Sequence, residues 1–439
     1  MSTKFFFIFY GLALLVTVAQ TAQNWHALHV QPEQLHLALG SNTNEMVVTW
    51  TTFNETKQST CKYGLGDALN LVAHGAHHKF TDGGHLKRFM FIHRVYLTNL
   101  TAASRYAYHC GSADGWSPLY HFKTLPSDES WSPKFVVYGD LGNINGRTLG
   151  RLAEEVQRGD HDVLLHVGDM AYDLHTDNAL VGDEFMRQIE PIAAYLPYQT
   201  CPGNHEHTYN FSNYRHRFSM HSQGHHEVNN IFWSYNIGPV HLVAFSTELH
   251  YFTQFGHEQI MTQYNFLKKD LEEANKPENR AKHPWIITIG HRPMYVQTHV
   301  VDLLRTGNHT HHWPGFEQLF YDAGVDLQFY GHEHNYERIL PIYNNKIHSG
   351  TTDPHNPYHN PKAPVHITTG SAGNRELHTK IHAKRSHYSA FIIEDYGFTY
   401  MKVINHSHVH IQQLSEDKGG KVVDEFYLIK DKHGVEAWK

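Results

Sequence analysis

Residues 325–334 read Val-Asp-Leu-Gln-Phe-Tyr-Gly-His-Glu-His, and the rest of the chain can be interpreted from this segment. Its first six residues are mostly apolar and predict a short buried strand. Two histidines, His332 and His334, follow directly after Gly331 at the predicted strand end. A pair of histidines in that position is typical of metal ligands. We therefore predict a metal site at the end of this strand.

The same pattern occurs four more times upstream. Strand-like runs at 134–138, 162–167, 195–200 and 285–289 are followed within a few residues by Asp140, Asp169, Asn204 and His291, respectively. Leu149, Leu152 and Val156 recur at helical spacing between the first two runs, which predicts a βαβ unit with parallel strands. Because the carboxyl ends of parallel strands meet at one edge of a sheet, we expect these polar side chains to converge there.

Further elements continue the alternation. Helical spacing predicts three more helices, around residues 185–192, 266–271 and 316–320. From about residue 363 the pattern returns to strands, with hairpin signals at Tyr396-Gly397 and Gly419-Gly420.

Residues from about 30 to 125 predict an all-β domain. β-branched and aromatic runs occur at 46–50, 89–97 and 105–110, separated by turn residues. This region resembles a fibronectin type III-like sandwich, although any small antiparallel domain would give a similar pattern. Cys61 and Cys110 lie in two of its strand-like segments and could form one disulfide, which would leave Cys201 unpaired.

Charge and histidine content narrow the functional class. The 439 residues carry a net charge of −7, which argues against a nucleic-acid-binding protein whose affinity depends on counterion release. The chain also contains 41 histidines, and protonation of all of them would move the net charge from −7 to +34. This number fits either compositional drift on a solvated surface or a protein that works in an acidic compartment.

The N-terminus predicts export. Residues 1–22 have a lysine near the start, an apolar run from Phe5 to Val18 and small residues at the end, as a signal peptide does. That run is too short for a comfortable membrane span, and no other long apolar run follows, so we expect no membrane span. The N-x-[ST] pattern predicts N-glycosylation at Asn54, Asn99, Asn210, Asn308 and Asn405. We expect a secreted or luminal glycoprotein.

Taken together, the motifs resemble those of the purple acid phosphatases, a family of the metallophosphoesterase superfamily. That family carries the blocks GDxG, GDxxY, GNH[ED], an apolar strand ending in His, and GHxH. They stand here in the same order at 139–142, 168–172, 203–206, 285–291 and 331–334. The resemblance covers nearly the whole chain after the signal peptide. It implies an α/β fold, a two-sheet α/β metallophosphoesterase sandwich preceded by the fibronectin type III-like domain. The expected domains are 30–125, 132–345 and a C-terminal part of the catalytic domain at 363–430.

The resemblance also implies a dinuclear metal centre. Asp140, Tyr172 and His334 would hold one ion, Asn204, His291 and His332 the second, and Asp169 would bridge both. Phenolate and carboxylate donors suit Fe(III), whereas imidazole and amide donors suit a divalent ion such as Zn, Mn or Fe(II). His205 would bind the phosphate or protonate the leaving oxygen.

The implied activity is that of an acid phosphatase, in which a metal-bound hydroxide attacks small phosphate monoesters. A homodimer is compatible with this interpretation. Two alternatives remain, a phosphodiesterase or nucleotide pyrophosphatase with the same centre, and a secreted glycoprotein that retains the fold without turnover. One departure affects specificity, because plant members carry two further histidines where this chain has Val300 and Val301. Other histidines lie nearby, at His299, His309, His311 and His312.

Overall fold

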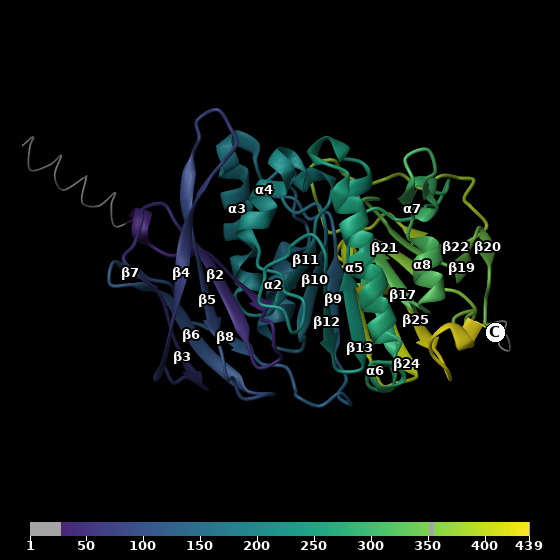
Figure 1. Ribbon diagram of the computed structural model, residues 1–439, viewed down its shortest axis with the longest axis horizontal. Helices are drawn as coiled ribbons and strands as arrows, with labels where there is room; N and C mark the ends of the chain where they lie inside the picture. Colours follow the sequence, from purple (N-terminus) through teal and green to yellow (C-terminus); the bar gives the residue numbers. More distant parts are fainter. Residues whose placement is uncertain (1–27, 351–354, 439) are drawn as a thin grey trace, which may run out of the picture.

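Three large sheets, built mainly from apolar strands, form the framework of the protein. The computed structural model describes residues 28–350 and 355–438, so the predicted signal peptide lies outside the described residues. A β-sandwich comes first, and a two-sheet α/β domain follows it (Figure 1). The expected fold class is therefore confirmed.

The N-terminal sandwich shares one long strand between its two layers. Its strands are β1 (Glu33–Leu39), β2 (Met46–Thr52), β3 (Ser59–Leu65), β4 (Leu71–Thr81), β5 (Phe89–Leu97), β6 (Arg105–Ser112), β7 (Gly115–Trp116) and β8 (Tyr120–Lys123). The first half of β4 pairs with β3 and the second half with β5, so β4 passes from one layer to the other. Cys61 and Cys110 face each other on β3 and β6 and form a buried disulfide between the strands.

The first sheet of the α/β domain combines segments far apart in the sequence. Its order is β11-β10-β9-β23-β24-β25. These strands are β9 (Lys134–Tyr138), β10 (Val163–Val167), β11 (Tyr198–Cys201), β23 (Gly397–Val403), β24 (His408–Ser415) and β25 (Lys421–Ile429). β9, β10 and β11 are parallel, as the βαβ pattern predicts. The C-terminal strands add to the sheet through antiparallel pairing of β23 with β9.

The second sheet has the order β12-β13-β14-β17-β21-β18-β22. Its strands are β12 (Trp233–Ile237), β13 (Val240–Ala244), β14 (Trp285–Ile289), β17 (Leu327–Tyr330), β18 (Tyr336–Ile339), β21 (Val365–Thr369) and β22 (Ser389–Ile393). β13, β14, β17 and β21 are parallel, so their carboxyl ends meet at one edge. The small hairpins β15–β16 (Gly307–Asn308 and Trp313–Pro314) and β19–β20 (Ile342–Tyr343 and Lys346–Ile347) lie outside the large sheets.

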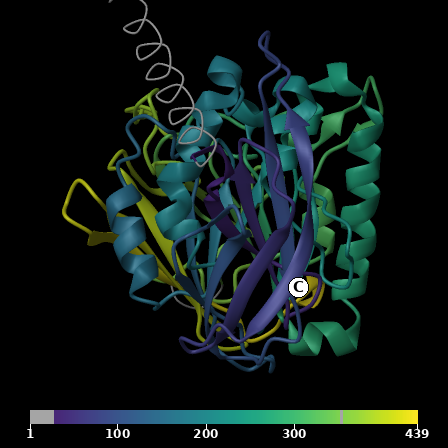
Figure 2. The ribbon, with the colours of Figure 1, turned by 90° about the vertical axis from the view of Figure 1, so that its left-hand side faces the viewer.

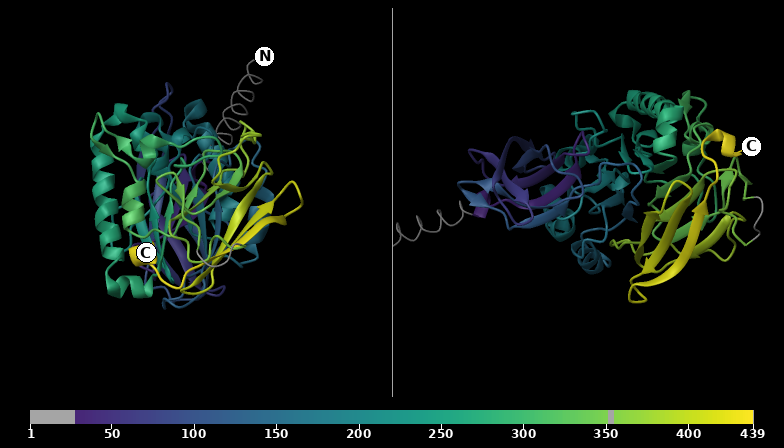
Figure 3. Two further views of the ribbon diagram at one scale, coloured as in Figure 1. Left: turned by 90° about the vertical axis from the view of Figure 1, so that its right-hand side faces the viewer. Right: turned by 90° about the horizontal axis from the view of Figure 1, so that it is seen from below.

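Helices flank the two sheets. They are α2 (Leu149–Gln157), α3 (Thr176–Ala193), α4 (Thr208–Arg217), α5 (Glu258–Ala274), α6 (Pro277–Lys282), α7 (Asp302–Arg305) and α8 (Glu317–Asp322). Four single-turn 3₁₀ segments are η1 (Asn204–Glu206), η2 (Glu248–His250), η3 (Thr253–Phe255) and η4 (Val435–Trp438). The N-terminal strands face the viewer in Figure 2, with α5 on one side of the molecule and the C-terminal strands on the other. In the left view of Figure 3, α5 and the C-terminal strands lie on opposite sides of the molecule. In the right view, the N-terminal strands lie at the left and the C-terminal strands at the right.

One predicted turn is wrong. Tyr396-Gly397 does not join a hairpin, because β22 before it belongs to the second sheet and β23 after it to the first. Gly419-Gly420 does connect the antiparallel pair β24 and β25. Residues after 363 therefore complete both sheets of the α/β domain rather than forming a separate layer.

The sandwich is joined to the α/β domain by partly buried polar contacts. Arg94 of β5 donates hydrogen bonds to the carbonyl oxygens of His216 and Phe218 (2.6 and 2.9 Å). Glu190 of α3 accepts from the Gln34 backbone N–H at 2.7 Å. These acceptors lie in or directly after α4 and in α3, so the sandwich is joined to the helices that follow β11 and β10.

The glycosylation candidates differ in exposure. Asn99 and Asn405 are exposed, whereas Asn54, Asn210 and Asn308 are half-buried. No helix within residues 28–350 and 355–438 has both the length and the apolar character needed to cross a membrane.

Several of the 41 histidines are buried rather than on the surface. Burial lowers the pKa of His36 to about 4 and that of His93, His166 and His366 to about 3. These four side chains therefore stay neutral in the folded protein at mildly acidic pH. At mildly acidic pH, the positive charge of the folded protein is therefore smaller than the number of histidines would give.

We expect His366→Phe to reduce the sensitivity of the protein to acid. The unfolded chain protonates His366 near pH 6.5, but the folded protein does so only near pH 3, so the free energy of unfolding falls as pH drops between these values. The loss between pH 6.5 and 4.5 amounts to on the order of 2 kcal/mol for this residue. Phe keeps the ring that stacks on Tyr330 and does not titrate. Urea unfolding at both pH values measures the difference, and an equal acid-induced loss in variant and wild type would contradict the assignment.

Candidate metal centre

The seven candidate ligands lie beyond the carboxyl ends of five parallel strands of the two sheets. Asp140 follows β9, Asp169 and Tyr172 follow β10, Asn204 follows β11, His291 follows β14, and His332 and His334 follow β17. The two sheets present these strand ends to each other, so the structure brings together side chains that lie up to 194 residues apart. This convergence is what the repeated pattern predicts.

One group of candidate ligands is joined by short contacts around Tyr172. The Tyr172 hydroxyl donates to Oδ1 of Asp140 at 3.0 Å and lies 2.8 Å from Nε2 of His334. Nδ1 of His334 lies 2.8 Å from the Leu377 carbonyl oxygen, so it donates there and leaves Nε2 directed at the phenol. Burial and the charge of Asp140 raise the pKa of Tyr172 well above its usual value, so the phenolate requires a cation to form.

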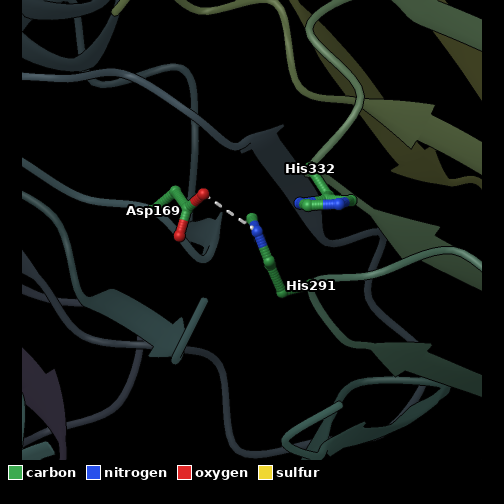
Figure 4. A group of neighbouring side chains, drawn as sticks. All are labelled: Asp169, His291 and His332. Atoms are coloured by element: carbon green, nitrogen blue, oxygen red, sulfur yellow. Dashed lines mark ion pairs between the residues drawn. The ribbon is translucent and has the colours of Figure 1, made fainter. Parts of the chain in front are cut away.

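The second group surrounds Asp169. Nε2 of His291 lies 3.0 Å from Oδ2 of Asp169 and 3.2 Å from Oδ1 of Asn204. One ligand atom each from Asp169, His291 and His332 lie within 4.8 Å of one another (Figure 4). Burial lowers the pKa of His291, but the charge of Asp169 outweighs it and raises the pKa to about 10. A metal ion would take the place of that proton between the two side chains.

The two groups are neighbours. Oδ2 of Asp140 accepts from the His332 backbone N–H at 2.9 Å. The ring of His205 lies 4.3 Å from the ring of Tyr172, and its Nε2 lies 3.9 Å from Oδ2 of Asp169. Asp169 belongs to the second group, and its charge also acts on Tyr172 and His334 of the first.

The backbone at the site is strained. Asp140, Asp169, Tyr172 and His332 have φ values of 62°, 52°, 54° and 68°. For residues with a Cβ, this left-handed conformation costs on the order of 1–3 kcal/mol each. Such strain persists only where the surroundings impose it, and it is concentrated at functional sites. Here it turns four candidate ligands toward one another at the strand ends.

Two motif glycines make room for ligand side chains. A Cβ on Gly203 would collide with the Asp169 carboxylate, and one on Gly331 would collide with the Asp140 carboxylate. The glycine before Asn204 and the glycine before His332 are thus required by close approach of the neighbouring strand end.

Glu206 holds the loops of β10 and β11 together. Its buried carboxylate accepts from the backbone N–H groups of Asp169, Met170 and Gly203, each at 2.9 Å. Burial, together with the nearby charge of Asp169, raises the pKa of Glu206 to about 7. Since it contacts backbone rather than ligand atoms, it positions the site without entering it.

His205 faces the centre from the side of Tyr172. Its Nδ1 lies 2.7 Å from Oδ1 of Asp173, and its Nε2 lies 3.6 Å from Oε1 of Glu376. Burial lowers the pKa of His205, but the bond to Asp173 and the charge of Asp169 outweigh burial and raise the pKa to about 9. With Nδ1 donating to Asp173, a protonated His205 carries its second proton on Nε2.

The other histidines near the site are less closely placed. His299 is exposed, and its charge acts on Glu333, which follows His332. His309, His311 and His312 are exposed in the β15–β16 hairpin, where His311 stacks on Trp313. Val300 and Val301 pack against the apolar core beside β14.

Sequence reasoning missed several residues of the site. Asp173 and Arg292 each follow a candidate ligand directly, which is a signal that could have pointed to them. None of the five sequence motifs includes Glu376 or the rest of residues 374–379. They reach the site only because the loop after β21 crosses it, where Asn374 donates to the Asp140 carbonyl at 3.1 Å.

The fold and this arrangement of donors define a calcineurin-like phosphoesterase domain with a purple-acid-phosphatase N-terminal domain, and three family models match the chain accordingly. They are "Purple acid Phosphatase, N-terminal domain" over residues 32–124, "Calcineurin-like phosphoesterase" over 133–336 and "Iron/zinc purple acid phosphatase-like protein C" over 363–425.

Whole-chain relatives agree with these models. An acid phosphatase type 7 of Danio rerio is 48% identical over 93% of this chain and 94% of its own length. That of Homo sapiens is 46% identical over 92% of each chain. The solved purple acid phosphatase from yellow lupin (Lupinus luteus) seeds shares the fold, with a TM-score of 0.74 at 24% identity over 91% of this chain and 75% of the lupin chain. The chain belongs to the purple acid phosphatase family.

We expect Glu206→Gln to loosen the centre. A glutamine amide presents one acceptor and one donor, so at least one of the three backbone N–H groups would lose its partner. The free energy of unfolding should fall by about 1–3 kcal/mol, and metal affinity should fall by about 10–100-fold. Urea unfolding and metal titration measure the two effects.

The matched control is Glu272→Gln on the exposed side of α5, which should change stability by less than about 0.5 kcal/mol. Unchanged stability and metal affinity in Glu206→Gln would refute the positioning role.

Proposed function

We propose that this protein is a secreted acid phosphatase that hydrolyses small phosphate monoesters at a dinuclear metal centre. The observation that carries the proposal is the convergence of seven buried or half-buried donors into two neighbouring groups, one around Tyr172 and one around Asp169. Membership in the purple acid phosphatase family supports the same reaction class.

The donor chemistry fits two different ions. Asp140, Tyr172 and His334 would hold Fe(III), since carboxylate and phenolate are hard anionic donors. Asn204, His291 and His332 are neutral donors and would hold Zn, Mn or Fe(II). Asp169 would serve both. When bound, the ions would supply Lewis-acid activation of water and of the phosphate group, so the chain needs no serine or cysteine nucleophile.

The protein's own groups would complete the reaction. His205 holds a proton on Nε2, directed toward Asp169 and Glu376, and can donate it to a phosphate oxygen or to the leaving oxygen. Asp173 keeps the ring in that orientation through Nδ1. The apolar and backbone surroundings of Tyr172 and His291, both fully buried, exclude bulk water from the inner side of the centre.

Hydrolysis and metal content test the proposal on the purified, secreted protein. We expect about two metal ions per chain, and turnover of p-nitrophenyl phosphate well above that of bis-p-nitrophenyl phosphate or ATP. A purple or pink colour would support Tyr172 as a ligand of Fe(III). Asp169→Ala should lose metal and activity together, because one carboxylate serves both groups.

Asp322→Ala, which removes an exposed carboxylate on α8, is the matched control and should retain both metal and activity. Preference for the diester or for ATP would favour the phosphodiesterase or pyrophosphatase alternative. Two metal ions per chain without any hydrolysis would favour the non-catalytic glycoprotein.

Export is the second part of the proposal. Its support is the signal-like segment 1–22 and the exposure of the sequon residues Asn99 and Asn405. Expression in animal cells should place the protein in the medium or the secretory lumen, with a mobility shift after N-glycosidase treatment. Asn405→Gln should remove one step of that shift. Unglycosylated protein retained in the cytosol would refute export.

A further inference from the structure

Arg292 is a fixed cation beside the centre that neither the motifs nor the ligand set explains. It directly follows His291 at the end of β14. Its Nε lies 3.1 and 3.0 Å from the two carboxylate oxygens of Glu248, whose side chain is fully buried. Its guanidinium carbon lies 4.4 Å from the centre of the Tyr251 ring. The side chain is therefore held from two sides.

The support beneath Arg292 is itself rigid. The Arg292 backbone N–H donates to the Thr247 hydroxyl at 2.9 Å, and that hydroxyl donates to Oε1 of Glu248 at 2.8 Å. Glu248 belongs to η2, which follows β13, the strand next to β14. Backbone and side chain of Arg292 are thus tied to the same short segment.

The far end of the guanidinium reaches the candidate ligands. Nη1 of Arg292 lies 2.9 Å from Nε2 of His332. A guanidinium group carries a positive charge, so the side chain places such a charge next to this histidine. The side chain is 18% exposed, which leaves part of it accessible from solvent.

The end of the guanidinium that faces His332 has no anion beside it among the contacts of Arg292. Glu248 balances the charge of Arg292 from behind, but its carboxylate lies at Nε, away from the Nη1 that approaches His332. Metal ions at the neighbouring donors would repel the guanidinium unless a negative group lay between them. A buried ion pair that served only to connect η2 and β14 would contribute little to stability. Such a pair would also not explain why Nη1 of Arg292 is directed at His332, a candidate metal ligand.

We propose that Arg292 binds a non-bridging oxygen of the substrate's phosphate group on the His332 side of the centre. This inference rests on the proposed phosphatase function and adds a phosphate-binding residue to it. The planar guanidinium matches phosphate oxygens with charge-assisted hydrogen bonds, which a lysine cannot reproduce in geometry. Arg292 would hold the phosphate from one side while His205 approaches it from the side of Tyr172.

A positive charge at Arg292 would affect the choice between phosphate monoesters and diesters, because the two differ in charge. A phosphate monoester carries up to two negative charges and three non-bridging oxygens, whereas a diester carries one charge and two such oxygens. A fixed cation therefore favours the monoester. Removal of Arg292 should lower the ratio of monoester to diester turnover as well as the affinity for phosphate.

Arg292→Met and Arg292→Lys, compared with wild type, test the proposal on the metal-loaded glycoprotein. Metal content per chain and the dissociation constant for inorganic phosphate, measured by calorimetry, are independent of turnover. We expect both variants to keep their metal. Arg292→Met should bind phosphate about 10–100-fold more weakly, the effect of one or two charge-assisted hydrogen bonds. Arg292→Lys should lie between Arg292→Met and wild type. Arg158→Met, at the exposed C-terminal end of α2, is the matched control and should bind phosphate as wild type does.

Two results would overturn the inference. One is phosphate affinity within about twofold of wild type in Arg292→Met. The other is loss of metal in both variants with a parallel loss of phosphate binding, which would make Arg292 a positioning residue for His332. Circular dichroism verifies folding, and Arg292→Lys keeps the test valid if the methionine variant does not fold. Wild-type protein that binds phosphate but hydrolyses no ester would refute the phosphatase function while retaining the anion site.

Discussion

The carboxylate of Glu206 imposes the constraint on which the centre depends. It is buried, and it accepts three backbone N–H groups from the loops that follow β10 and β11. Without it, the N–H groups of Asp169 and Gly203 would lack partners in a dry interior, at a cost of about 1–3 kcal/mol each. With it, the left-handed backbone at Asp169 is held, and the Asp169 carboxylate stays against His291 in the second group of donors. The strain at the strand ends is therefore offset by hydrogen bonds made one layer further out.

The same region concentrates buried charge. Asp140, Asp169, Glu206 and Glu248 are all buried within a few ångströms of candidate ligands or of the groups that position them. Isolated carboxylates are costly in such surroundings, so each has a charged or hydrogen-bonded partner. For Asp169 that partner is His291, and for Glu248 it is Arg292. The arrangement suits metal cations, which can take the place of the proton between Asp169 and His291.

The N-terminal sandwich contributes to this arrangement from a distance. Arg94 donates to the carbonyl oxygens of His216 in α4 and of Phe218 directly after it, and Tyr108 donates to the Ala194 carbonyl oxygen at the end of α3. Both contacted segments lie between strands that carry candidate ligands. These contacts join the sandwich to the ends of the helices that follow β10 and β11. The His205 side of the site follows β11 of the first sheet, whereas the Arg292 side follows β14 of the second sheet.

By itself, the sequence determined the parts of this protein that depend on local pattern. Strand runs followed by glycine and a ligand-type residue predicted both the parallel strands and six of the seven side chains that converge, because parallel strands bring their carboxyl ends to one edge. The seventh, Tyr172, came from the resemblance of residues 168–172 to a family motif. Contacts between distant segments have no such local signal. The crossing of Tyr396-Gly397 between sheets, the loop that brings Glu376 to His205, and the pair formed by Arg292 and Glu248 are decided by packing of elements far apart in the chain. Only the tertiary structure shows them, because a side chain's partner across two sheets depends on their three-dimensional register rather than on its neighbours in sequence.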